Sequence, residues 1–335
     1  MLKIGIIGSG FGLYGLLPAF NAVKSCRVTC ICGKKTERLL NYCRSIKLEN
    51  IYTDWRQMLE QENLDALAIA VTPNAQYEIA KAAIKKNLNI FAEKPFTANY
   101  RQAKELLKLA QKKRIVHTID YTFPEIEEWQ KVKQLIDKKT YGKLRHISVN
   151  WNFLSYDIRK GISGWKTDVR EGGGALSFYF SHSLYYLEHY AGEVVNLRSL
   201  LSYSPESKNG GEVGVNLLLK FKNGATGDAA IRCNDKHSYR HELIFICEKA
   251  TVVLESKQGV FENFTINIYN GKEQKQLFVK KSKVSARNED ERVRVEKKFA
   301  ARFVNGCINK KSVKPTFAEG LRVQKLTEEI RKQAI

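Results

Sequence analysis

The chain has 335 residues, of which 43% are hydrophobic and 27% are charged, and its formal net charge is +21. This length predicts two domains with ordinary cores, and no apolar stretch reaches the roughly 18 residues of a membrane span. The positive charge comes mostly from scattered lysine pairs, without a basic tail or a nucleic-acid motif. We therefore interpret it as a solvated surface that attracts anionic small molecules, and we expect neither nucleic acid nor membrane as a partner.

The cysteine pattern indicates the redox environment. Seven cysteines are present, an odd number without any C-x-x-C pair. We expect free, buried thiols in a reducing cytoplasm, with no disulfides and no metal site. The short apolar N-terminal stretch leads directly into a glycine loop and has no cleavage site, so it does not resemble a signal peptide.

Residues 1–122 alternate short apolar runs with segments of helical spacing. Strands are predicted at 2–7, 27–32, 64–71, 88–92 and 115–119, and helices at 12–24, 36–45, 75–86 and 99–112. Strands and helices that alternate at this spacing are typical of βαβ units around a parallel sheet. The first domain is therefore predicted to be α/β with a parallel sheet.

The pattern changes at residues 120–124, and we assign residues 123–335 to a second domain. After a helix at 125–138, strands with two-residue alternation are predicted at 147–153, 213–221, 225–232, 241–247, 250–256 and 264–269. Asn223-Gly224 is a hairpin signal. Such strands predict a large, open, mostly antiparallel sheet with helices on one face. The other face suggests a homodimer or homotetramer, and the C-terminal helix can pack back on the first domain.

A glycine-rich loop lies between the first strand and the first helix. It consists of Gly8, Ser9, Gly10, Phe11, Gly12 and Leu13. The first glycine permits a tight turn, and the second lets the backbone approach a pyrophosphate at the helix N-terminus. The third fingerprint position is Leu13 rather than Gly or Ala, although Gly12 and Gly15 lie beside it. In its βαβ context, the loop predicts a dinucleotide site and hence a Rossmann domain.

The end of the second strand indicates which dinucleotide is bound. NAD sites usually have an acidic residue here for the ribose 2′-hydroxyl. This chain instead has Gly33, which leaves room, followed by Lys34, Lys35 and Arg38. Their charges suit a 2′-phosphate, so we expect NADP to be preferred over NAD. The alternative is that the lysines merely cover a turn.

Four further motifs occur in a characteristic order. They are Thr72-Pro73-Asn74, Ala92-Glu93-Lys94-Pro95, Gly172-Gly173-Gly174-Ala175-Leu176 followed by His182, and Thr316-Phe317-Ala318-Glu319-Gly320-Leu321. Together they resemble the glucose–fructose oxidoreductase / inositol dehydrogenase (Gfo/Idh/MocA) family over almost the whole chain. The resemblance implies a Rossmann domain plus a C-terminal α/β domain for substrate binding and oligomerisation. It also implies NAD(P)-dependent hydride transfer to or from a sugar-like or nucleotide-sugar alcohol or ketone.

The resemblance implies residue roles as well. Lys94 matches the family's catalytic lysine, which polarises the substrate oxygen, and His182 is the expected proton carrier. Beyond the glycine loop and Gly33, Lys34, Lys35 and Arg38, the residues assigned to the cofactor are Thr72, Pro73, Asn74, Glu93 and Lys94. Those assigned to the substrate are Tyr121, Trp165, Lys166, Tyr179, His182 and Tyr185. Each role has a purely structural alternative. Lys94 can be an ordinary surface lysine, and His182 can be an incidental histidine in an aromatic packing face. Residues 165–168 can be a loop that only packs.

Three positions depart from the family pattern. Phe178 stands where many catalytic members carry Asp, Tyr185 stands where many carry a second Asp, and Phe180 replaces a glycine. Phe178 can neither exchange a proton nor orient an imidazole. Either a tyrosine at 121, 179 or 185 substitutes for the acid, or His182 works with Lys94 alone, or hydride transfer is lost.

These departures keep two alternatives to a sugar oxidoreductase open. One is a cofactor-binding regulatory or non-catalytic member of the fold. The other is a reductase of a non-sugar substrate, as in the biliverdin reductase branch. The retained Glu93, Lys94, Pro95 and His182 favour the sugar enzyme.

Overall fold

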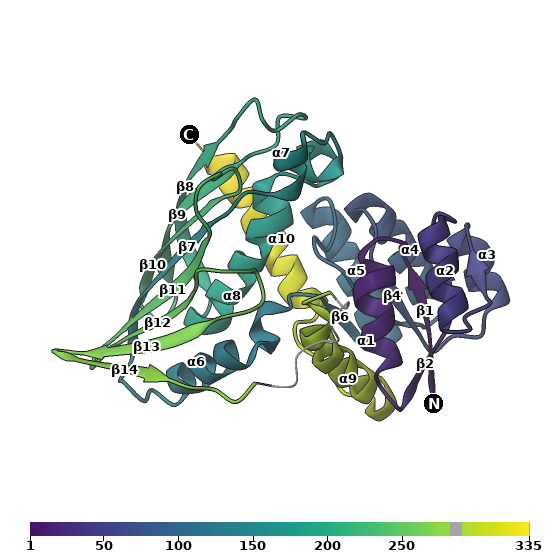
Figure 1. Cartoon of the computed structure of the whole chain (residues 1–335), viewed down its shortest axis with the longest axis horizontal. Helices are drawn as coiled ribbons and strands as arrows, with labels where there is room; N and C mark the ends of the chain where they lie inside the picture. Colours follow the sequence, from purple (N-terminus) through teal and green to yellow (C-terminus); the bar gives the residue numbers. More distant parts are fainter. Residues whose placement is uncertain (282–289, 335) are drawn as a thin grey trace. The chain divides into compact units, whose positions relative to one another are not determined.

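A computed structural model describes residues 1–281 and 290–334 (Figure 1). Its contacts divide the chain into two compact units. The first comprises Met1–Thr122 and Ser282–Gln324, and the second comprises Phe123–Lys281 and Lys325–Ile335. The division after Thr122 falls where the sequence periodicity changes. The described residues of 282–324 belong to the first unit, although the sequence grouped them with the second domain.

The first unit is built on a six-stranded parallel sheet in the order β3-β2-β1-β4-β5-β6. Its strands are β1 (Leu2–Ile7), β2 (Cys26–Cys32), β3 (Ile51–Tyr52), β4 (Ala66–Ile69), β5 (Asn89–Ala92) and β6 (His117–Ile119). Its helices are α1 (Leu17–Asn21), α2 (Glu37–Ser45), α3 (Trp55–Gln61), α4 (Pro73–Lys85), α5 (Tyr100–Lys113) and α9 (Val293–Asn309). This strand order confirms the predicted Rossmann fold.

Aromatic packing explains why α9 belongs to the first unit. Phe299 and Phe303 on α9 are fully buried. Their rings lie 5.1 and 5.6 Å from that of Phe91 on β5, and Phe303 also contacts Phe20 of α1 at 6.2 Å. Edge-to-face ring pairs of this kind combine buried apolar area with favourable electrostatics. The segment returns to the first unit because that unit contains the partners for its apolar face.

The prediction of one regular helix over residues 12–24 was wrong. The chain forms a wide π turn over Gly12–Leu16 before α1 begins at Leu17. Pro18 lacks a backbone N–H and cannot continue an established helical ladder, but it is tolerated in the first turn of a new one. The short elements β3 and α3 were not predicted, because neither is long enough to show a clear period.

The second unit contains an eight-stranded sheet in the order β14-β13-β12-β11-β7-β10-β9-β8. Its strands are β7 (Leu144–Asn152), β8 (Val194–Ser202), β9 (Gly214–Phe221), β10 (Thr226–Arg232), β11 (Arg240–Cys247), β12 (Thr251–Ser256), β13 (Thr265–Asn270) and β14 (Glu273–Leu277). Its helices are α6 (Glu127–Asp137), α7 (Tyr156–Lys160), α8 (Ser181–Ala191) and the end of α10 (Phe317–Gln333). All pairs are antiparallel except β7 with β10, as the sequence predicted for most of the sheet.

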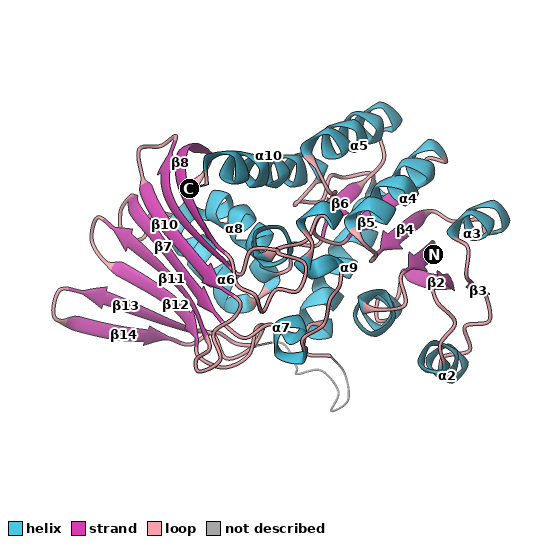
Figure 2. Ribbon diagram, turned by 90° about the horizontal axis from the view of Figure 1, so that it is seen from above, coloured by secondary structure: helices cyan, strands magenta, loops and turns pink. Residues whose placement is uncertain are grey.

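The two faces of this sheet differ. Helices α6 and α8 lie on one face, and no helix of the described chain covers the other (Figure 2). On β7, Ile147, Val149 and Trp151 are buried, in agreement with the predicted alternation. On β9, Leu218 is 65% exposed and lies between Arg198 and Asp228 of the neighbouring strands. The second face is thus a mixed apolar and polar surface.

Two remaining features are the state of the cysteines and the hydropathy of the helices. All seven cysteines are free and buried, as predicted. None of the helices in the described part of the chain combines the length and hydropathy that a membrane span requires.

Candidate active site

The carboxyl ends of β1, β4 and β5 meet at one edge of the first sheet. The strand order reverses between β1 and β4, because the chain runs outward through β2 and β3 and then returns to the other side of β1. In open α/β sheets, ligands bind at such a switch point. The glycine loop follows β1, Thr72 follows β4, and Lys94 follows β5. The sequence motifs of the first unit are therefore gathered at the edge where a dinucleotide is expected.

The glycine loop is shaped for close approach. Gly8 has φ +128°, and a Cβ there would lie 2.2 Å from the carbonyl oxygen of Ala70. A Cβ on Gly10 would meet nothing within 4 Å, so the backbone is open to a ligand at this position. A Cβ on Gly12 would lie 3.2 Å from Ile6, so Gly12 provides the close helix–strand packing usually supplied at the position of Leu13. These features fit a pyrophosphate at the helix N-terminus.

The end of β2 contacts the same loop. A Cβ on Gly33 would lie 2.7 Å from that of Ser9, which explains why no acidic side chain occupies this position. Lys34 and Lys35 are exposed beside it. The guanidinium of Arg38 lies 5.0 Å from the ring centre of Tyr14. The basic residues predicted at this edge are therefore present around the loop.

Sequence reasoning missed Arg292, which also covers the glycine loop. Its guanidinium lies 4.1 Å from the ring centre of Phe11 and 5.6 Å from that of Tyr14. It also donates two hydrogen bonds to Asp290, at 2.8 and 2.9 Å. The sequence contains no signal for this contact, because Arg292 lies in a charged stretch far from the loop along the chain.

The turn that carries Lys94 is held by buried polar groups. The backbone N–H of Lys94 donates to Glu93 Oε2 at 3.2 Å. Gln76 on α4, which is fully buried, donates through Nε2 to the carbonyl oxygens of Glu93, Pro95 and Phe96. Helix α4 begins at Pro73, directly after Thr72, so the Thr72-Pro73-Asn74 motif places Gln76 one turn along the helix. A polar residue on the apolar face of this helix was the available sequence signal for Gln76.

Three carboxyl groups gather beside this turn. Thr122 Oγ1 lies 2.5 Å from Asp120 Oδ1 and 2.9 Å from Glu296 Oε1. Asp120 and Glu296 are each 1% exposed. Burial, together with nearby Asp120, raises the pKa of Glu93 well above its ordinary value. Burial, Asp120 and Glu93 likewise raise the pKa of Glu296.

The number of hydrogen-bond donors available at this place agrees with a proton on Glu296. The single proton of the Thr122 hydroxyl serves only one of its two carboxyl neighbours. Glu296, whose pKa is raised, is satisfied when it carries a proton itself and donates to the Thr122 oxygen. Three ionised carboxylates at one buried place would also repel one another strongly. The sequence signal was Glu296 on the apolar face of α9, between Val293 and Phe299.

In the second unit, His182 lies on α8 among aromatic rings. It is 6% exposed, and its ring meets that of Phe123 edge-to-face at 5.1 Å. Phe123 also contacts Trp151 at 5.5 Å and His241 at 5.0 Å. His241 is fully buried, and burial lowers its pKa to about 3. His182 lies near the start of α8 (Ser181–Ala191), and nothing in the sequence indicated that His241 would join the same aromatic group.

Phe178, at the position where the resemblance implied an acid, is packed among residues predicted for the substrate. Its ring lies 5.3 Å from Trp165 and 4.7 Å from Tyr179. The Lys166 ammonium lies 5.0 Å from the ring centre, and it is 3.6 Å from Asp157. Trp165, Lys166 and Tyr179 therefore form one group around Phe178.

The other two predicted substrate residues lie elsewhere. The Tyr185 ring is 5.7 Å from that of His189 on the same helix. Tyr121 belongs to the first unit and is 2% exposed.

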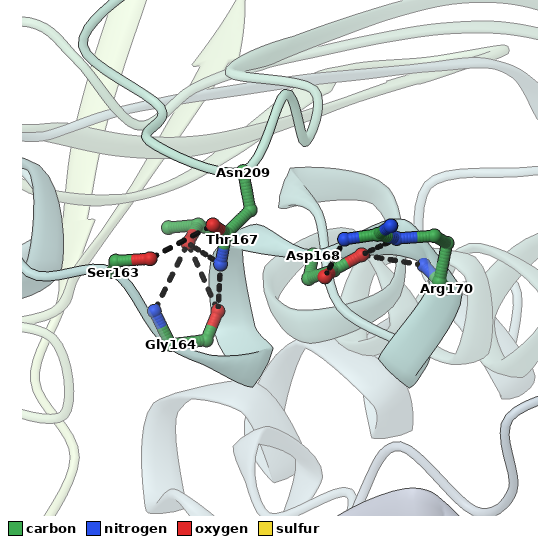
Figure 3. A network of polar contacts seen from close by, with 6 residues as sticks. All are labelled: Ser163, Gly164, Thr167, Asp168, Arg170 and Asn209. Carbon is green, nitrogen blue, oxygen red and sulfur yellow. Dashed lines mark hydrogen bonds and ion pairs between the residues drawn. The ribbon is translucent and has the colours of Figure 1, made fainter.

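Hydrogen bonds order the loop that precedes the triple glycine (Figure 3). Thr167 Oγ1 and Asn209 Nδ2 both donate to the carbonyl of Gly164 at 3.0 Å. Arg170 binds Asp168 through Nε at 3.0 Å and Nη2 at 2.7 Å, and these hydrogen bonds lower the pKa of Asp168. Arg170 is thus already paired with Asp168.

The triple glycine itself is tightly enclosed. A Cβ on Gly173 would lie 1.9 Å from the Trp165 carbonyl oxygen, and Gly174 has φ +87°. Arg331 of α10 donates to the Gly173 carbonyl at 2.9 Å and to Glu212 Oε1 at 2.8 Å. The start of the His182 segment is therefore held by the C-terminal helix, a contact that the sequence did not indicate.

Comparison with known proteins agrees with this architecture. Residues 2–121 match the model of an oxidoreductase family with an NAD-binding Rossmann fold, and residues 129–253 match the GFO/IDH/MocA C-terminal domain. The chain belongs to the Gfo/Idh/MocA oxidoreductase family. An uncharacterised oxidoreductase of Synechocystis sp. is 28% identical over 201 residues, which cover 60% of this chain and 54% of the relative. The chain thus spans about half the length of this curated relative.

Relatives with described activities are more distant. Levoglucosan dehydrogenase of Pseudarthrobacter phenanthrenivorans is 24% identical over 71% of this chain and 70% of its own length. A solved levoglucosan dehydrogenase with NADH superimposes with a TM-score of 0.87 at 18% identity, over 99% of this chain and 96% of that one. A 3-ketoreductase from Actinomadura kijaniata with NADP and TDP-benzene gives 0.81 at 18% identity, over 99% and 98%. At this identity, the structural matches show a shared fold.

Proposed function

We propose that this protein is an NAD(P)-dependent oxidoreductase that transfers a hydride between the nicotinamide and a CH–OH group of a sugar or nucleotide sugar. The observation that carries the proposal is the sheet edge at which the open glycine loop and the Lys94 turn meet. Relatives named levoglucosan dehydrogenase, myo-inositol 2-dehydrogenase and dTDP-sugar 3-reductase support the substrate class. When bound, the nicotinamide supplies the hydride acceptor or donor.

The chain's own residues then handle charge and protons. The Lys94 ammonium holds the substrate oxygen and stabilises the negative charge that develops on it. His182 takes the hydroxyl proton during oxidation and returns it during reduction. We infer that its aromatic neighbours, Phe123 among them, exclude water and help to fix the imidazole by packing.

Three further features belong to the proposal. NADP is preferred, supported by the exposed Lys34 and Lys35 and the absence of an acid at Gly33. The protein is cytoplasmic, supported by its seven buried free thiols. It forms a homodimer or homotetramer through the second face of the large sheet, supported by the exposed Leu200 and Leu218.

One observation favours a second candidate, a cofactor-binding regulatory protein without turnover. The place of the family's acid is filled by Phe178, packed against Trp165 and Tyr179. The two candidates differ in whether cofactor binding is followed by reaction.

A substrate panel tests the proposal directly. The protein is mixed with NADP⁺ or NAD⁺ and with myo-inositol, levoglucosan, UDP-sugars or dTDP-sugars, and NAD(P)H absorbance is followed. We expect cofactor-dependent turnover of at least one of them. Tight NADPH binding, measured by fluorescence, without turnover of any of them would favour the regulatory protein.

A further inference from the structure

The buried amide of Gln76 makes an unusual set of contacts with the turn that carries Lys94. Its Nε2 lies 2.6 Å from the carbonyl oxygen of Glu93, 3.1 Å from that of Pro95 and 2.9 Å from that of Phe96. Gln76 itself is 0% exposed. One side-chain nitrogen therefore binds carbonyls on both sides of Lys94.

The orientation of this amide follows from its neighbours. Three carbonyl oxygens converge on it, so only the NH₂ end can face them, since the opposite orientation would place oxygen against oxygen. The buried Oε1 of Gln76 accepts no hydrogen bond from the residues that the structure describes. A buried polar atom without a partner costs stability. Gln76 thus leaves its own acceptor unsatisfied, while the two hydrogens of its NH₂ group are shared among three carbonyls of a single turn.

The contacts define the backbone from which the Lys94 side chain starts. The carbonyl of Glu93 belongs to the peptide just before Lys94, and that of Pro95 belongs to the peptide just after the proline. Glu93 is also tied to β4, because its N–H donates to the Ile69 carbonyl at 2.9 Å. A lysine side chain is long and flexible, so the place of its ammonium depends first on how its Cα is held.

We propose that Gln76 is a positioning residue for Lys94: its amide fixes the turn 93–96 so that the Lys94 ammonium is directed to the substrate oxygen. The inference rests on the proposed function, since it gives Lys94 the polarising role. Gln76 acts through the turn and not by contact with the reacting atoms.

The test measures Lys94 directly and needs no substrate. Labelling of Lys94 by isotopically marked acetic anhydride is followed by peptide mass spectrometry over a range of pH in the wild type and in Gln76→Leu. We expect the labelling of Lys94, followed as a function of pH, to differ between Gln76→Leu and the wild type. Gln76→Glu, which keeps the shape of the side chain but is a donor only when protonated, should give a profile between those of the wild type and Gln76→Leu.

Asn89→Leu is the matched control. Asn89 begins β5 at the opposite edge of the sheet, where it donates to the Asp65 carbonyl at 2.9 Å and accepts from the Val116 N–H at 2.8 Å. Its loss should lower stability without altering the Lys94 profile. An identical Lys94 profile in Gln76→Leu, Asn89→Leu and the wild type would overturn the inference.

Turnover separates this inference from the proposed function. With an active panel sugar, Gln76→Leu should lower kcat by about 10–100-fold, the scale of a displacement of about 1 Å, and should add nothing in a Lys94→Ala background. If Lys94→Ala loses turnover while Gln76→Leu keeps both turnover and labelling, only the positioning role fails. If Lys94→Ala keeps full turnover, the proposed role of Lys94 fails, and the labelling profile alone decides whether Gln76 positions it.

Discussion

The surroundings of Lys94 and of His182 are built from opposite kinds of side chain. Lys94 lies in a turn held by the Gln76 amide and next to the carboxyl groups of Glu93, Asp120 and Glu296. His182 lies against Phe123 in a group of packed rings. Hydrogen bonds specify direction and charge state, whereas aromatic packing specifies shape and excludes water. The turn that carries Lys94 is therefore held by polar groups, whereas the His182 ring is held by packing against other rings.

The comparison also shows where the titratable acids lie. Phe178 stands near His182 where the family resemblance led us to expect an acid, whereas buried carboxyl groups with raised pKa values gather in the first unit. Substitutions can therefore test whether the first unit works through charge and the second through packed apolar surface.

The largest effects are expected at the two candidate catalytic residues. Lys94→Ala should lower turnover by about 10²–10³, the scale for losing one preorganised donor. His182→Ala should lower it by about 10²–10⁴, the scale for losing acid–base help, and should leave cofactor affinity intact. Both are measured by NADPH absorbance and fluorescence titration. Unchanged turnover in His182→Ala would show that the aromatic enclosure does not serve a proton carrier.

Charge at the end of β2 is expected to set cofactor choice. Lys34→Glu should weaken NADPH binding by about 1–3 kcal/mol, because it replaces a charge-assisted contact to the 2′-phosphate with repulsion. NADH binding should change much less. Lys24→Glu, at an exposed position near the other end of β2, is the control in a fluorescence titration. Equal affinity of the wild type for NADH and NADPH would refute the preference.

The uncovered face of the large sheet is expected to bind a second subunit. Leu218→Asp should weaken self-association by about 2 kcal/mol, roughly 30-fold, the scale of an interface hot spot. Ile308→Asp on α9, where the side chain is 52% exposed, is the matched control. Light scattering at micromolar concentration should show a dimer or larger for the wild type and the control. A wild-type mass of one chain would exclude the interface.

The carboxyl cluster is expected to give the first unit a pH-dependent stability. Glu296 has a raised pKa when folded, so its stabilising contribution is complete below about pH 4.5 and is lost as pH rises through the folded pKa. Glu296→Gln mimics the protonated acid. It should match the wild type near pH 4 and be more stable by about 1–2 kcal/mol near pH 8.

Denaturant unfolding at both pH values measures this difference. The exposed Glu49→Gln should change little at either pH. A Glu296→Gln variant that is less stable than the wild type at pH 8 would mean that the cluster is held ionised by a charge partner.

The local sequence determined much of the first unit. Apolar runs of strand length, helical segments between them and the glycine loop after the first strand were sufficient to predict a parallel sheet and its cofactor edge, because each feature depends on neighbours within one βαβ unit. The strands of the second unit were predicted wherever two-residue alternation was clear. Strand β8 was missed. Strand β14 was missed as well, because it is largely polar and exposed.

Contacts between distant segments were decided only by the tertiary structure. Gln76 reaches the Lys94 turn, Glu296 and Asp120 meet through Thr122, and Arg331 holds the Gly173 carbonyl. The sequence alone fixes which side chains can donate, accept or titrate, and it identifies Lys94 and His182 as candidates through their motifs. Which groups are buried together depends on packing between elements far apart in the chain, and that burial is what raises the carboxyl pKa values and aligns the amide with its three carbonyls.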